Sequence, residues 1–68
     1  MKPGFYISGV GEGGVRHIMV TCNQFTGDPW PTREAAQKWL TAALAVNSHD
    51  SLRSLWGEPS ELRVEEVT

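Results

Sequence analysis

Cys22, His17 and His49 are the side chains of this 68-residue chain that could form a nucleophile and base pair or ligate a soft metal ion. A catalytic thiolate needs a nearby base, but His17 and Cys22 are five positions apart and point to opposite faces of a regular strand. No CxxC or HxxxH spacing brings two metal ligands together. We therefore predict a protein that is not an enzyme and has no metal site, with Cys22 buried or half-buried and both histidines on the surface.

The stretch ISGVGEGGVRH raises the question of phosphate binding, because Gly9, Gly11 and Gly14 match the nucleotide-binding pattern G-x-G-x-x-G. That fingerprint functions where a strand turns into a helix whose amino terminus faces a pyrophosphate. Here the glycines precede VRHIMVTC, which has the β-branched residues typical of a strand, and Glu12 would place a negative charge beside the phosphates. The pattern indicates a hairpin turn, and no nucleotide or other cofactor is predicted.

Two strands are predicted at about residues 4–10 and 15–22, separated by the turn GEGG. If Val10 lies opposite Val15, the antiparallel register fixes which side chains share a face. The more apolar face, which we predict to be the core face, pairs Ile7 with Ile18 and Phe5 with Val20. The second face pairs Tyr6 with Met19 and Ser8 with His17.

A helix is predicted at about 33–46, where Thr32 is a plausible N-cap and apolar residues recur at helical spacing. A short helix at about 51–56, capped by Asp50 or Ser48, and a strand at about 61–67 follow. The sequence leaves open which hairpin strand the last one joins. The order ββα(α)β predicts a two-layer α+β fold in one domain, 1–68, with a small antiparallel sheet and one main helix on one face.

The composition of the chain limits the classes of partner that it can bind. Six Lys and Arg against eight Asp and Glu give a formal charge of −2, and no basic run supplies the counterion release on which nucleic-acid binding depends. The start, MKPGFYIS, lacks an uninterrupted apolar stretch, so neither a signal peptide nor a membrane span is predicted. A single cysteine fits a reducing compartment. We expect a cytoplasmic protein with no nucleic-acid or membrane partner.

Three tryptophans are an excess for so short a chain. Trp39 and Trp56 are assigned to the core by their helical spacing. Trp30 lies between Pro29 and Pro31 in a stiff loop, where an indole is well suited to bind a partner. The alternative, that Trp30 folds back onto the edge of the core, is left open.

The second sheet face and the acidic carboxyl end supply further candidates, since one helix layer cannot cover both faces of a sheet and carboxylates can seek a basic surface. The predicted partner-binding residues are Tyr6, Val10, His17, Met19, Trp30, Glu61 and Glu65. The leading prediction is a protein-binding module that occludes a functional surface, such as a nucleic-acid groove, on a larger protein. A single-stranded nucleic-acid-binding or regulatory domain, with Tyr6 as a stacking platform, and a homodimeric structural protein are the alternatives.

The organisation from MKPGFYISGVGEGG through PWPTREAAQKWL to ELRVEEV resembles small accessory proteins of bacteriophages and mobile elements, including anti-CRISPR-type inhibitors. The resemblance covers the whole chain and rests on size, strand and helix order, and mild acidity. It implies an inhibitor of a host factor. No functional residue is carried over, because no motif defines such proteins.

Overall fold

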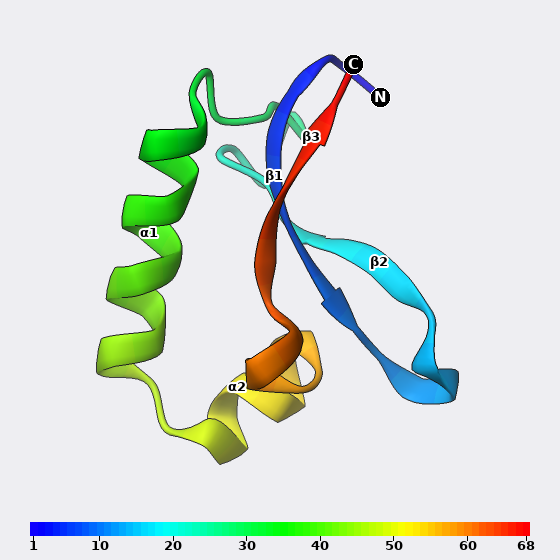
Figure 1. Ribbon diagram of the computed structural model, residues 1–68, viewed down its shortest axis with the longest axis vertical. Coiled ribbons are helices and arrows are strands. Elements are labelled where there is room, and N and C mark those ends of the chain that lie inside the picture. The colour runs from blue at the N-terminus through cyan, green and yellow to red at the C-terminus, as the bar shows by residue number, and fades with distance from the viewer.

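The computed structural model describes all residues 1–68 and contains a three-stranded antiparallel sheet with two helices packed on it. The strands β1 (Gly4–Val10), β2 (Arg16–Val20) and β3 (Arg63–Val67) lie in the order β2-β1-β3. Helix α1 (Arg33–Val46) runs along one face of the sheet, and α2 (His49–Trp56) lies toward the end that carries the hairpin turn (Figure 1). The predicted α+β class is confirmed, and the last strand, whose neighbour the sequence left open, joins β1. Neither helix combines the length and hydrophobicity needed to cross a membrane.

Both helices begin at side-chain caps. Thr32 is extended, and its Oγ1 accepts a hydrogen bond of 3.1 Å from the backbone N–H of Ala35, which starts α1 at the predicted residue. At the start of α2, Ser48 accepts from the N–H of Ser51 at 3.2 Å. Ser48, not Asp50, is therefore the cap, and α2 begins two residues before the predicted 51.

The predicted hairpin is confirmed, but its predicted register is wrong. The N–H of Gly11 donates to the Val15 carbonyl and closes the hairpin loop. Between these two residues the chain forms a 3-10 turn at Glu12–Gly14. Gly13 and Gly14 adopt φ of 82° and 74°, which favours glycine and allows so short a turn. Val10 consequently pairs with Arg16 instead of Val15.

A β-bulge then shifts the register a second time. Ile7 pairs with Val20 and Ser8 with Ile18, so Met19 is the extra residue between them. Met19 turns to the helix side of the sheet, where its Cγ lies 3.2 Å from the position a Cβ on Gly9 would take. The predicted pairing of Met19 with Tyr6 on the second face is therefore wrong, as is that of His17 with Ser8, because His17 pairs with Gly9.

The core lies between the sheet and the helices and includes Trp30. Six buried residues form one contacting cluster there: Ile7, Trp30, Ala36, Leu40, Leu52 and Leu62. Trp30 is only 7% exposed, and its backbone exchanges hydrogen bonds of 3.1 and 2.8 Å with Phe5. Its ring centroid lies 5.5 Å from that of Trp39, which lies 5.5 Å from that of Trp56. Of the two alternatives for Trp30, the structure adopts the one in which it closes the edge of the core.

Tyr6, predicted to be exposed on the second face, is fully buried. It lies on the central strand with neighbours on both sides, and its hydroxyl donates a 2.7 Å hydrogen bond to the Lys2 carbonyl. A buried tyrosine generally needs such a partner for its hydroxyl. The amino-terminal residues therefore satisfy the hydroxyl, and Tyr6 offers no surface to a partner in this structure.

Candidate functional site

The structure places the seven predicted partner-binding residues in four separate locations. Tyr6 and Trp30 are interior residues, as described above. Glu61 and Glu65 lie on the second face of the sheet and near its edge. Met19 and Val10 line a hollow on the helix side, and His17 is an exposed residue of β2. No single surface unites all seven.

A polar network covers the second face of the sheet. The Arg16 guanidinium donates to Ser8 Oγ at 2.9 Å, to the Glu61 carbonyl at 2.7 Å and to the Glu61 carboxylate at 2.8 Å. Glu65 accepts from Arg63 Nε at 2.9 Å and from Ser8 Oγ at 3.3 Å. The hydrogen bond from Arg63 is the main cause that holds the pKa of Glu65 below its ordinary value. Glu61 and Glu65, the two acidic residues predicted to bind a partner, are thus hydrogen-bonded within the chain.

Replacing Glu65 with glutamine is expected to flatten the acid limb of the stability profile. Since the native pKa of Glu65 lies below the ordinary 4.5, the ionised side chain stabilises the fold above that pH, and the effect disappears as pH falls through the lowered native pKa. For a partly exposed pair the effect is about 0.5 kcal/mol. Urea denaturation should be measured at neutral pH and again at a pH well below the ordinary glutamate pKa. The free energy of unfolding of E65Q should be lower than that of the wild type at neutral pH only. A deficit of equal size at both would contradict the assignment.

Five of the six basic side chains of the protein form ion pairs. The pairs are Lys2 with Asp28, Arg16 with Glu61, Arg33 with Glu66, Arg53 with Asp50 and Glu58, and Arg63 with Glu65. Guanidinium groups already paired with carboxylates are poor ligands for phosphates, because each new contact must replace an existing one. The buried Tyr6 also removes the predicted stacking platform.

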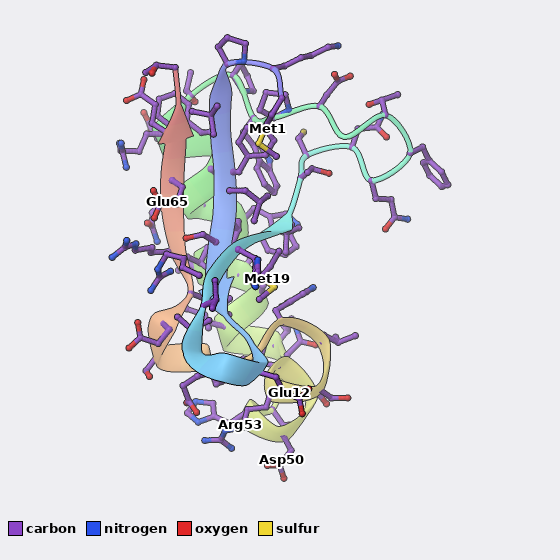
Figure 2. The ribbon with its side chains drawn as sticks, turned by 90° about the vertical axis from the view of Figure 1, so that its right-hand side faces the viewer. Met1, Glu12, Met19, Asp50, Arg53 and Glu65 are labelled. Carbon is purple, nitrogen blue, oxygen red and sulfur yellow. The ribbon has the colours of Figure 1, made fainter.

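An open groove of about 820 Å³ runs along β2 on the helix side, and we call it the β2 groove. Its lining includes Met19 and Val20 from the strand, Phe25 from the following loop, and Trp39 and Trp56 from the helices. None of its eleven lining residues is charged. Figure 2, which faces β2, shows Met19 between the projecting loop above and α2 below. The arrangement offers apolar and aromatic surface, bounded at both ends, to a ligand.

Phe25 is 90% exposed on a loop that is tightly hydrogen-bonded. The Asn23 side chain accepts from the N–H groups of Phe25 and Thr26 at 2.9 and 3.3 Å, and Gly27 N–H donates to the Asn23 carbonyl at 2.7 Å. The salt bridge from Lys2 to Asp28 measures 2.6 Å, and this contact raises the pKa of Lys2 and lowers that of Asp28. The loop therefore presents an aromatic ring to solvent on a defined backbone.

The sequence prediction missed Phe25. The signal was present in NQFTGDP, where a phenylalanine with no periodic apolar neighbour is surrounded by residues that form turns. Such a pattern indicates a side chain that the core does not use. The conformation of the loop depends on Lys2, which lies 26 residues from Asp28, and this contact could not be inferred from local sequence.

The free edge of β2 is the third component of the site. Its five residues pair with β1 on one side, and no backbone hydrogen bond joins them to any other segment. An unpaired strand edge is a template for another strand unless charge or covering elements protect it. β3, the other edge, carries the three charged residues Arg63, Glu65 and Glu66, whereas β2 carries one, Arg16, whose guanidinium is bound to Ser8 and Glu61.

The residues considered for catalysis or metal binding do not assemble. Cys22 is exposed, which contradicts the prediction of a buried or half-buried thiol, because the chain leaves the sheet after Val20 and enters the Phe25 loop. Cys22 lines the β2 groove without a histidine or carboxylate beside it in the lining. No three His, Cys, Asp or Glu side chains gather where they could hold a metal ion. The glycine pattern forms a strand-to-strand turn, as predicted, with no helix amino terminus behind it.

Comparison of the chain with protein-family models, with curated proteins and with solved structures finds no match.

Proposed function

We propose that the protein is a small non-enzymatic protein-binding module whose binding site is the β2 groove, with Phe25 at one end. The observation that carries the proposal is the coincidence of three features on one side of the molecule: an uncharged aromatic groove, an unpaired strand edge, and a rigid loop that exposes a phenylalanine. Aromatic side chains dominate binding energy at protein interfaces. A loop that is already ordered loses little entropy on binding.

The lining of the groove supports binding better than catalysis. An enzyme site needs several polar groups that converge on a reacting atom. The possible nucleophiles among the lining residues are Thr21 and Cys22, and the lining includes no acid, base or cationic side chain that could activate them. The polar groups of the lining are neutral hydroxyl and amide groups, which suit hydrogen bonds to a peptide.

The predicted mode of action, occlusion of a functional surface on a larger protein, is compatible with this site. The resemblance to phage accessory proteins implies that this larger protein is a host factor. Occlusion requires only that the module binds tightly and covers a partner surface. A cytoplasmic location, which the single cysteine favours, also fits the proposal. We propose no nucleic-acid function, because the basic side chains are largely paired and Tyr6 is buried.

Affinity capture with site-directed variants tests the proposal. Phe25→Ser is expected to weaken binding of a captured partner at least about tenfold, since aromatic hot spots contribute about 2 kcal/mol or more. The matched control is Val46→Ser, which removes another exposed apolar side chain, 82% accessible at the end of α1 and outside the groove. Equal binding by the wild type and the Phe25 variant, with loss in the Val46 variant, would place the interface elsewhere.

A further inference from the structure

The β2 groove has a direction, because charge is concentrated at one end of it. A second hollow adjoins it and shares Met19 and Trp56 with it. The second hollow is also lined by Glu12, Glu58 and Arg53. Asp50 lies nearby on α2 and is 98% exposed. Figure 2 shows Glu12, Arg53 and Asp50 at the same end of the molecule, below Met19.

The balance at this end is acidic. Arg53 is shared between Asp50 at 3.4 Å and Glu58 at 3.2 Å, while Glu12 has no ion-pair partner. Three carboxylates therefore face one guanidinium. The groove beside them is uncharged, so a ligand that fits both regions must be apolar along most of its length and basic at one end.

We propose that the partner contributes an extended segment that adds to the sheet antiparallel to β2, with apolar side chains at alternate positions followed, toward its carboxyl end, by lysine or arginine. This proposal rests on the proposed function and names the ligand of the same site. Main-chain hydrogen bonds to a free edge give affinity in this mode of recognition, and pockets for alternate side chains give specificity.

The polarity follows from the position of the acidic end. β2 begins at Arg16, directly after the turn that carries Glu12, and runs away from it toward Thr21. An antiparallel partner therefore has its carboxyl end beside Glu12 and Glu58. Antiparallel pairing is favoured because its hydrogen bonds are slightly more stable than those of parallel strands.

A second copy of this chain fits the site poorly. The two exposed edges it could offer are β2 and β3. In an antiparallel pair, the carboxyl half of β3 would bring Glu65 and Glu66 to the acidic end. A second β2 would place its Arg16 at the opposite end, beside Val20, where the groove is neutral. Charge complementarity therefore selects a segment of a different protein over self-association.

Selection from a phage-displayed library of random peptides tests the inference on the wild-type protein. The enriched sequences are expected to alternate apolar with other residues and to carry Lys or Arg on the carboxyl side. A synthetic peptide of the leading sequence should bind Glu12→Lys about fivefold more weakly than wild type, because attraction becomes repulsion. Glu34→Lys, with the same charge change on the outer surface of α1, should bind like wild type. Hydrogen exchange should slow at amides of Arg16–Val20 when peptide is added.

Three results would overturn the inference: no enrichment, enriched sequences with the basic residues on the amino side or absent, or protection at β3 instead of β2. A concentration-dependent dimer blocked by the selected peptide would show that the groove accepts a second copy instead. If partner capture still depends on Phe25 in any of these cases, the proposed function survives and the peptide inference alone fails. If partner capture does not depend on Phe25 and the peptide selection also fails, the β2 groove is not the binding site.

Discussion

Replacing Trp30 with alanine is expected to destabilise the protein by about 3–5 kcal/mol, the usual cost of truncating a buried large aromatic residue. Trp30 is 7% exposed, packs against Trp39 and closes the edge of the core. A domain of this size has a total stability of only about 3–10 kcal/mol. Thermal and urea denaturation followed by circular dichroism should therefore show a fold that is marginal or lost.

Phe25→Ala is the matched control for Trp30→Ala, because it also removes an aromatic ring from the loop between β2 and α1. Phe25 is 90% exposed, so its loss should change stability by no more than about 0.5 kcal/mol. A Trp30 variant with the melting temperature of the wild type and a specific loss of partner binding would contradict the interior role. It would restore the alternative in which Trp30 contacts a partner.

Gly57→Ala is expected to cost about 3 kcal/mol through backbone strain and a steric clash. Gly57 ends α2 with φ of 82° and ψ of −157°, a conformation that is almost confined to glycine. A Cβ there would collide with the Val10 carbonyl, which accepts a 3.3 Å hydrogen bond from the N–H of Glu58. The substitution must move the end of α2 away from β1, and urea denaturation measures the loss.

Gly13→Ala separates the cost of backbone strain from the cost of the steric clash. Gly13 has the same φ of 82°, but no atom lies within 4 Å of the position its Cβ would occupy. Its replacement should cost only about 1 kcal/mol, the strain of a left-handed alanine. Similar losses for the two variants would show that contact between α2 and β1 contributes little.

Helix α1 could be predicted to the residue because its determinants are local. The Thr32 cap, Glu34 in the first turn and the apolar spacing all lie within the segment they define. The first residues of α2 and β3 were predicted less accurately than their last residues, because Ser48 and Asp50 compete as caps and Pro59 starts a 3-10 turn that delays β3 to Arg63.

The predicted core face is confirmed for Phe5, Ile7 and Val20, which belong to the core or pack against it. The faces of the other β2 residues could not be predicted, because a register depends on pairs of residues that are distant in sequence. The first error was the length of the turn, and the second was a bulge at Met19 that no local pattern announced. Together they moved Met19 to the helix side, which made it part of the β2 groove. The burial of Tyr6 also depends on contacts distant from its own strand, because β3 pairs beside it and the Lys2 carbonyl accepts from its hydroxyl.

The order of the strands has a consequence for synthesis of the chain. β1 precedes β2 and β3 in the chain, yet it occupies the centre of the sheet, and Ser8 bonds to Glu65, 57 residues later. The ribosome therefore releases β1 and β2 as a hairpin that is marginal alone, and one edge of β1 stays unpaired until Arg63–Val67 emerges. Nascent chains shorter than this must depend on rapid completion or on chaperones to avoid aggregation. The pair Gly4 and Val67, beside the two ends that lie close together in Figure 1, can form only after residues 4 to 67 have all been synthesised.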